Sequence, residues 1–125
     1  MILGIGTDLA SIRRMAAALE RHGDRFAWRI LAEDEREAYL AAQDKPRFLS
    51  KRFAAKEAFG KALGTGVARP ATLHQVRVAH DPAGRPLFAF GDELAEHMRR
   101  EGLRAHLSIS DEEDLAQAFA IIERT

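Results

Sequence analysis

The order of segments in this chain predicts an α+β fold, in which an antiparallel sheet packs against one long helix and several shorter helices. A short apolar segment opens the sequence, and mainly helical patterns follow as far as position 63. The second half then changes to two pairs of short alternating segments, with one helical segment between the pairs. Helices and strands that occur in separate runs are typical of α+β domains.

Residues 2–8 predict a buried strand, because the run is apolar, too short for a helix and interrupted by two glycines that let other backbone approach closely. Asp8 stands at the end of this strand. Ser11 is placed to cap a helix that runs to about Arg21, in which apolar residues recur every three or four positions.

The next segments predict more helix. Residues 26–31 form a short helical piece, and residues 33–42 form another helix whose acidic first turn suits the helix dipole. The longest helix is expected over residues 46–63, because proline is tolerated in a first turn and the Gly-Thr-Gly sequence at 64–66 can end the helix.

At about 100° per residue, this long helix has one apolar stripe and one polar side. The stripe consists of Ala55, Ala58, Phe59 and Ala62. Ser50, Glu57 and Lys61 are expected on the opposite side. A polar side opposite an apolar one is also what an ordinary surface helix shows.

The second half predicts four strands in two hairpins, with strand ranges 75–79, 87–90, 106–110 and 116–123. The first hairpin turns at residues 81–84, and the second turns at residues 111–114. Residues 92–101 predict a helix between the hairpins. Nothing resembling a linker or repeat interrupts the chain, so we expect a single domain over residues 1–125.

Composition limits the classes of function. Nineteen basic and nineteen acidic side chains give zero formal charge, which disfavours a protein whose main task is to bind nucleic acid. The lack of cysteine excludes disulfides, thiolate metal sites and a cysteine nucleophile. No run approaches the ~20 apolar residues that span a bilayer, and no basic region precedes the first apolar run. We therefore expect a cytoplasmic protein with no membrane partner.

The sequence RFAAKEAFGKALGTG over residues 52–66 carries the most informative chemistry. Glu57 and Lys61 lie one helical turn apart on the same side, so a carboxylate and an ammonium can face one phosphate-bearing ligand. Asp8 can supply a second carboxylate. Mg²⁺ usually takes one or two protein carboxylates and completes its coordination with phosphate oxygens and water. The pattern therefore indicates phosphate chemistry.

Each of these residues also has a purely structural interpretation. Glu and Lys four positions apart occur on many solvated helices and stabilise a helix by only ~0.2–0.5 kcal/mol. An aspartate after a strand, such as Asp8, commonly begins a turn or caps a helix. Lys56 is equally suited to lie across its neighbours as a surface side chain.

Three motifs distinguish between these interpretations: GIGTDL at residues 4–9, RFAAKEAFGKALGTG, and HLSIS at residues 106–110. In this order and spacing they resemble the holo-acyl carrier protein synthases, the small class of 4′-phosphopantetheinyl transferases. The similarity extends through RFAWRIL, the Gly84-Arg85-Pro86 turn and AFAIIER, and so covers nearly the whole chain.

The resemblance implies a 4′-phosphopantetheinyl transferase-like fold and a reaction. The 4′-phosphopantetheine group of coenzyme A moves to a serine of apo-acyl carrier protein, which gives holo-acyl carrier protein and adenosine 3′,5′-bisphosphate in support of fatty acid biosynthesis. The family is trimeric with active sites between subunits, so a homotrimer is also expected.

The resemblance further implies roles for single residues. Asp8 and Glu57 are expected to hold Mg²⁺, and Lys61 to place positive charge beside the attacked phosphorus. Glu57 or a water that it orients would accept the serine proton, and the sequence leaves both routes open. The expected contacts of coenzyme A are Arg52, Lys56, Lys61, Arg85, Pro86 and His106. A packed strand histidine and a solvated helix arginine are the structural alternatives for His106 and Arg52.

Asp111 stands where many family members have a histidine, which leaves open whether it joins the metal ligands or only begins a turn.

Arginines concentrate in the first two helical segments. Because carrier proteins are acidic, the resemblance makes Arg14, Arg25 and Arg29 the expected docking contacts. Ordinary solvated arginines are the alternative, since acidic residues dilute the patch.

Two other functions remain as alternatives. A non-catalytic module could use the same arginines to bind an acidic partner protein. A nucleotide-binding regulatory domain is less favoured, because the chain has no glycine-rich phosphate loop of the P-loop type.

Overall fold

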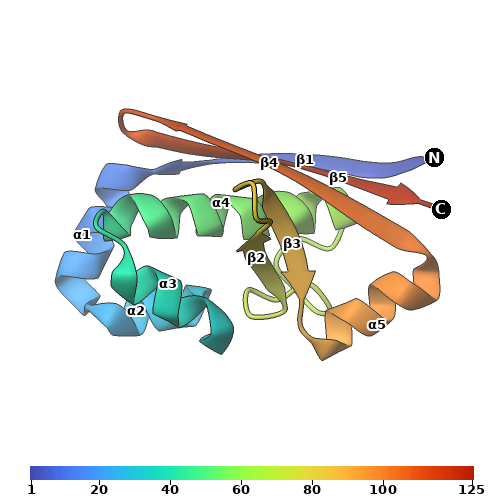
Figure 1. The fold of residues 1–125 in the computed structure, drawn as a ribbon, viewed down its shortest axis with the longest axis horizontal. Coiled ribbons are helices and arrows are strands. Elements are labelled where there is room, and N and C mark those ends of the chain that lie inside the picture. Colours follow the sequence, from blue (N-terminus) through green and yellow to red (C-terminus); the bar gives the residue numbers. More distant parts are fainter.

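A three-stranded antiparallel sheet lies across the long helix α4 in the computed structural model, which describes all residues 1–125 (Figure 1). The elements are β1 (Ile2–Ser11), α1 (Ile12–His22), α2 (Asp24–Ile30), the 3₁₀ helix η1 (Glu33–Glu35), α3 (Arg36–Ala41), α4 (Lys45–Leu63), β2 (Val76–His80), β3 (Pro86–Phe90), α5 (Asp92–Glu101), β4 (Leu103–Glu112) and β5 (Leu115–Arg124). The predicted α+β class with an antiparallel sheet is confirmed.

The strand order of the sheet is β1-β5-β4, and the β2–β3 hairpin forms a separate two-stranded sheet. Both hairpins were predicted, but β1 and β4 are longer than expected. Pairing with β5 explains the difference: β1 stays in register as far as Ser11, opposite Leu115, and β4 is paired from Leu103 to Glu112. A ladder formed with a distant strand is not visible in local sequence patterns.

The helices agree with the prediction at their ends more than in their interiors. Ser11 caps α1, since its Oγ accepts a hydrogen bond from the Arg14 backbone N–H at 3.2 Å. The predicted helix over 33–42 is instead divided into η1 and α3. Glu35 explains the division, because its side chain turns inward and accepts from the Ala32 backbone N–H at 2.9 Å.

Small residues let β1 lie directly on α4. A Cβ atom on Gly4 would stand 2.0 Å from the Ala62 carbonyl oxygen, and one on Gly6 would stand 2.1 Å from the Ala58 carbonyl oxygen. No larger residue fits at either position. Because alternate residues of a strand face the same side, Asp8 follows Gly4 and Gly6 onto the face that meets α4. This packing places Asp8 beside the helix that carries Glu57 and Lys61.

Helix α4 is enclosed on more sides than its sequence suggested. The sheet covers one side, while α1 to α3 and the β2–β3 hairpin pack against it from other directions (Figure 1). Ser50, which was expected on the polar side, is fully buried, and its hydroxyl donates to the Pro46 carbonyl at 2.8 Å. The predicted apolar stripe of Ala55, Ala58, Phe59 and Ala62 is buried, but the placement of Ser50 on an exposed polar side was wrong, because the helix has tertiary neighbours around most of its surface.

The face of the sheet that points away from α4 is uncovered in the single chain, and it is largely apolar along β1 and the adjoining part of β5. Leu3, Ile5 and Leu9 of β1 are 41%, 61% and 60% exposed, and Leu115 and Phe119 of β5 are 48% and 40% exposed. Contiguous exposed apolar side chains commonly mark an interaction surface. No helix of the chain combines the length and the apolar character needed to cross a membrane.

Candidate active site

The structure brings Asp8 of β1 together with Lys61 of α4. The Lys61 ammonium donates hydrogen bonds to Asp8 Oδ1 at 3.0 Å and to the Thr7 carbonyl at 2.9 Å. The Asp8 side chain is 17% exposed and the Lys61 side chain is 54% exposed. The Asp8 carboxylate is therefore largely buried at the contact between β1 and α4, while the Lys61 side chain reaches solvent. We call Asp8, Glu57 and Lys61 the Asp8 site.

Glu57 belongs to the same electrostatic environment. Partial burial raises the pKa of the Glu57 carboxyl, the negative charge of Asp8 raises it further, and the positive charge of Lys61 opposes both effects. Two carboxylates share one ammonium here, so the site has an excess of negative charge. Such a site favours a cation near the two acids.

The donor set fits Mg²⁺. No cluster of three or more His, Cys, Asp or Glu side chains that could hold a metal ion occurs in the chain. The negative charge of Asp8 acts on Glu57, so these two carboxylates are the acids that the Asp8 site offers to a cation. This matches the preference of Mg²⁺ for oxygen ligands and for one or two carboxylates, with the other positions filled by substrate oxygens and water.

Lys56 lies on the opposite side of α4 and is fully buried. Its ammonium donates to Glu35 Oε1 at 2.6 Å and to the carbonyls of Leu73 and Val76 at 2.7 and 2.6 Å. Burial lowers the pKa of Lys56 to about 8, although the charge of Glu35 opposes this effect. Because an ammonium has three donors, none remains for a coenzyme A phosphate. The structure gives Lys56 a role inside the fold.

Arg52 joins the same interior group. Its Nη1 donates to Glu35 Oε2 at 3.0 Å, and its guanidinium stacks over the Phe48 ring at 4.5 Å from the ring centroid. Glu35 Oε2 also accepts from the Val78 backbone N–H at 3.1 Å. We call Glu35, Arg52 and Lys56 the buried ion cluster. Sequence reasoning missed Glu35, because nothing local distinguishes it from its acidic neighbours in η1.

His106 lies far from the Asp8 site in the topology of the sheet. It is on β4, the edge strand opposite β1, and it pairs in register with Ile121. Its side chain is 52% exposed and belongs to the outer face, whereas Asp8 belongs to the face that meets α4. Its Nε2 lies 2.5 Å from Glu123 Oε2. The packed-histidine alternative does not apply, because the ring is exposed.

Arg85 and Pro86 lie at the β2–β3 hairpin. Arg85 is exposed in the turn, and Pro86 begins β3 opposite His80. Strand β3 packs against β4. The residues expected to bind coenzyme A thus lie in three places within one chain: Lys61 beside β1, Arg52 and Lys56 in the buried ion cluster, and Arg85, Pro86 and His106 on the β4 side.

Asp111 is not part of the Asp8 site in this chain. Its carboxylate pairs with Arg47 Nη1 at 2.8 Å and with Lys51 Nζ at 3.4 Å, near the start of α4. The hydrogen bond from Arg47 is the main reason that the pKa of Asp111 is lowered. Asp111 lies inside β4, so it does not begin the turn, and it ties the end of that strand to α4.

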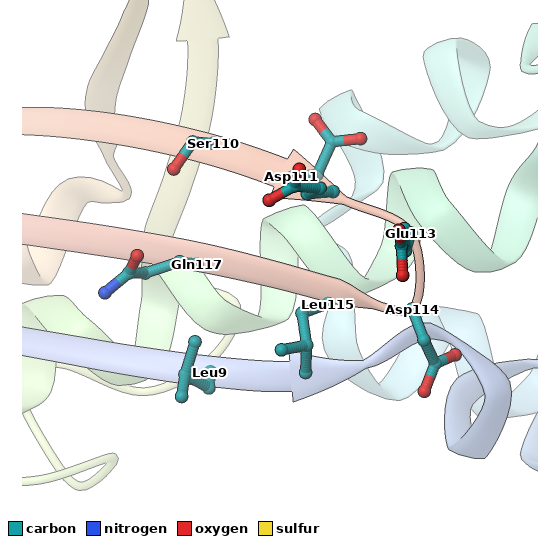
Figure 2. A pocket seen from close by; sticks show the side chains of 8 residues that line it. Leu9, Ser110, Asp111, Glu113, Asp114, Leu115 and Gln117 are labelled. Atoms are coloured by element: carbon teal, nitrogen blue, oxygen red, sulfur yellow. The ribbon is translucent and has the colours of Figure 1, made fainter.

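A concavity of about 590 Å³ lies at the tip of the β4–β5 hairpin. Figure 2 shows Leu9, Leu115 and Gln117 along its strands, with Asp111, Glu113 and Asp114 around the tip. Asp114 accepts from the Arg13 backbone N–H at 2.8 Å and from the Ser11 hydroxyl at 3.1 Å. Because Asp111 and Asp114 already have partners within the fold, this concavity is a weaker candidate for the reaction than the Asp8 site.

The predicted docking arginines are exposed on α1 and α2. Arg25 and Arg29 line one shallow pocket together with Arg21, His22 and Phe26. Arg14 borders a second, mainly apolar pocket, which also contains Phe26 and is lined further by Leu9, Ala10, Ser11, Met15, Ala18 and Phe53. Since this pocket also includes Ala10, which follows Asp8 on the same face of β1, the basic and apolar surface adjoins the Asp8 site.

Comparison with known proteins agrees with this geometry. Residues 4–121 match the sequence profile of the 4′-phosphopantetheinyl transferase superfamily. A holo-[acyl-carrier-protein] synthase of Azoarcus sp. (strain BH72) is 63% identical over 123 residues, which are 98% of each chain. The crystal structure of holo-[acyl-carrier-protein] synthase from Neisseria meningitidis superposes with a TM-score of 0.95 at 41% identity and covers 99% of this chain and 100% of its own.

A holo-(acyl-carrier-protein) synthase from Bacillus anthracis, solved in complex with CoA (3′,5′-ADP), superposes with a TM-score of 0.85 at 32% identity and covers 100% of this chain and 99% of its own. Sequence and structure thus agree over almost the full length. The chain belongs to the 4′-phosphopantetheinyl transferase superfamily.

Proposed function

We propose that this chain is a holo-acyl carrier protein synthase, which transfers the 4′-phosphopantetheine group of coenzyme A to a serine of apo-acyl carrier protein. The single observation that carries the proposal is the meeting of Asp8, Glu57 and Lys61 where β1 crosses α4. Relatives named for this activity match the chain over nearly its full length. The complex of the Bacillus anthracis relative with CoA (3′,5′-ADP) supports the choice of donor.

The reaction is a phosphoryl transfer. The serine Oγ forms a bond to the phosphorus that carries the pantetheine arm, and the bond from that phosphorus to the bridging oxygen breaks. The bridging oxygen leaves with adenosine 3′,5′-bisphosphate, and the serine proton needs an acceptor. Glu57 is suited to accept it, directly or through a water, because its raised pKa makes it a better base than an ordinary glutamate.

Lys61, Asp8 and Glu57 have separate roles in the rest of the reaction. The Lys61 ammonium reaches solvent next to Asp8, where its charge can offset negative charge on the phosphoryl oxygens. Asp8 and Glu57 would hold Mg²⁺. Such an ion, when bound, supplies electrostatic stabilisation to the pyrophosphate and the leaving group. Asp8 also fixes Lys61 by the 3.0 Å hydrogen bond.

We also propose a homotrimer whose active sites lie between subunits, with three as the number that the family resemblance implies. Asp8 and His106 lie on opposite faces and opposite edge strands of the sheet, so one coenzyme A molecule meets both only if a second subunit contributes His106. The uncovered apolar face around Ile5, Leu9 and Phe119 offers a surface for that contact. Arg85 and Pro86 would join His106 from the second subunit.

Arg52 and Lys56 differ in this scheme. Nη1 of Arg52 is bonded to Glu35, and its other guanidinium nitrogens keep it a candidate for a coenzyme A phosphate. Lys56 has no spare donor, so we assign it to the fold.

The direct test of the whole proposal is to mix the protein with coenzyme A, Mg²⁺ and apo-acyl carrier protein and to follow the carrier by intact mass.

We expect the carrier to gain one phosphopantetheine group, and we expect a chelator to prevent the gain until Mg²⁺ is restored. If no member of a panel of acyl carrier proteins gains the group, the enzyme assignment is contradicted. Full activity in the presence of the chelator would contradict the proposed metal site but not the enzyme assignment.

The non-catalytic alternative rests on the exposed arginines of α1 and α2, and it makes a different prediction. It predicts carrier binding without any transfer by the wild-type chain. As an enzyme, the chain should respond to Arg14→Glu with an increase of about tenfold in carrier KM, a flatter dependence of KM on salt and an unchanged kcat. Steady-state kinetics at two salt concentrations measures this, and unchanged carrier kinetics would remove Arg14 from the docking surface.

A further inference from the structure

Glu123 and His106 form a pair on the outer face of the sheet, near the chain termini. In the β4–β5 register, Arg104 is directly opposite Glu123, and His106 is opposite Ile121. His106 is therefore a diagonal neighbour of Glu123 on the same face. Although Arg104 stands directly across, the hydrogen bond of the carboxylate goes to the imidazole, with 2.5 Å between Nε2 and Oε2.

The pair fixes how the imidazole is presented. The hydrogen bond from His106 is the main reason that the pKa of Glu123 is lowered, and the N-terminal amine and Arg104 lower it further. An ionised carboxylate only accepts hydrogen bonds, so Nε2 carries a proton. The other ring nitrogen, Nδ1, then lies on the opposite edge of a half-exposed ring, where a ligand can reach it.

We propose that Glu123 is a positioning residue, which accepts from Nε2–H of a doubly protonated His106 ring and so holds Nδ1–H toward a phosphate group of coenzyme A bound at the subunit boundary. This inference rests on the proposed function, which makes His106 a coenzyme A contact. The carboxylate fixes one ring orientation, in which one ring N–H donates to Glu123 and the other can donate to the phosphate, as acids behind ligand-binding histidines commonly do. Without it, binding must restrict a ring that otherwise samples other rotamers.

The sign of the effect separates positioning from simple charge. Coenzyme A is strongly anionic, so removal of a nearby negative charge should tighten its binding if Glu123 acts only through its field. Removal of a positioning group should weaken binding. We therefore expect Glu123→Gln, which keeps the shape of the side chain, to raise the calorimetric Kd for coenzyme A by about fivefold to tenfold.

Glu101→Gln is the matched control, because Glu101 is an exposed acid whose closest cation is Arg124, at 3.9 Å, near the same end of the sheet. We expect its Kd for coenzyme A to be unchanged or slightly lower. A Kd for Glu123→Gln that equals or falls below the wild-type value would overturn the proposal.

Two further measurements show whether Glu123 acts through His106. In a His106→Ala background, Glu123→Gln should no longer change the Kd, and a full additive loss would overturn the proposal. Nitrogen NMR of the His106 ring in the coenzyme A complex should find protons on both ring nitrogens in the wild type and a population that lacks one of these protons in Glu123→Gln. An identical ring spectrum in the two proteins would also overturn it.

These readouts do not need turnover. A wild-type chain that binds coenzyme A but transfers nothing would contradict the proposed function while the Glu123 effect remains measurable. If the wild-type chain transfers normally but Glu123→Gln changes neither the Kd for coenzyme A nor the ring spectrum, the function stands and only this inference is refuted. Absence of coenzyme A binding by the wild type would overturn both.

Discussion

Lys56 and Glu57 are adjacent in sequence, yet they belong to two ionic groups with opposite properties. In the buried ion cluster, Glu35, Arg52 and Lys56 are almost completely excluded from solvent, and the Lys56 ammonium has three acceptors within the chain. In the Asp8 site, the Lys61 ammonium bonds to Asp8 and acts electrostatically on Glu57, and the Lys61 side chain is 54% exposed.

The comparison teaches how to separate structural from functional charges on one helix. Charges that the chain itself compensates hold α4 against η1 and β2. Charges that the chain leaves undercompensated and accessible are available to a ligand. The two groups should therefore respond to mutation in different measurements, stability for the first and turnover for the second.

Glu35→Gln should give the largest effect and should appear as a loss of stability. The change leaves the charges of Arg52 and Lys56 in the interior without their shared carboxylate, so the free energy of unfolding should fall by about 3–5 kcal/mol. Urea unfolding followed by circular dichroism measures it. Glu33→Gln, an exposed change in the same 3₁₀ helix, should stay within about 0.5 kcal/mol of wild type. A loss as small as that of the control would show that the cluster does not stabilise the fold.

Glu57→Gln should give the complementary result. We expect kcat to fall by about 10²-fold or more, because the variant loses a base and a metal ligand. The unfolding free energy should not decrease, because no hydrogen bond within the fold depends on this carboxylate and its repulsion with Asp8 disappears. Phosphopantetheinylation rates and urea unfolding on one preparation test both parts. Lost stability together with near-normal turnover would reverse the assignment of the two groups.

The sequence was sufficient to predict the elements around the Asp8 site, because their signals are local. The glycines of β1, the serine cap of α1 and the Gly-Thr-Gly end of α4 each depend on a few neighbouring residues. The spacing of Glu57 and Lys61 predicted one side of a helix. The strand-to-helix contact that brings Asp8 to them then follows from the absence of Cβ atoms at Gly4 and Gly6.

The buried ion cluster was not predictable, because its partners come from distant parts of the chain. Glu35 bonds to Lys56 across 21 positions and to the Val78 backbone across 43 positions. From sequence, Lys56 was interpreted as a surface side chain or a phosphate contact, and an interior position was not predicted. Ser50 was misplaced for the same reason, since a period of 3.6 residues locates a second buried side only when the elements covering it are known.

Lys61→Ala should lower turnover more than it lowers the affinity for coenzyme A. Its exposed charge should matter most as negative charge moves onto the phosphoryl oxygens, so we expect kcat to fall roughly tenfold to a hundredfold. KM for coenzyme A should change far less. Steady-state kinetics with saturating carrier separates the two constants. A pure increase in KM would make Lys61 a binding residue instead.

The smallest expected effect is a difference in how the two glutamates couple stability to pH. Burial by itself raises the pKa of Glu35, but the charge and hydrogen bond of Lys56, with backbone hydrogen bonds from Ala32 and Val78, lower it overall. Below the ordinary glutamate pKa of 4.5, the unfolded chain therefore binds the Glu35 proton first. The stability contributed by Glu35 is present above that pH and is lost as the pH falls further.

Burial and Asp8 raise the pKa of Glu57, so the sign is opposite: the folded chain holds this proton at a pH where the unfolded chain has lost it. Stability from Glu57 therefore falls as the pH rises through the interval just above 4.5. Urea unfolding in a chelator across that interval should show Glu57→Gln gaining on wild type by a few tenths of a kcal/mol, a value limited by solvent screening. Because Asp8 is the second cause of the raised pKa, the gain should shrink in an Asp8→Asn background. A gain that persists there undiminished would mean that the two carboxylates do not share one site.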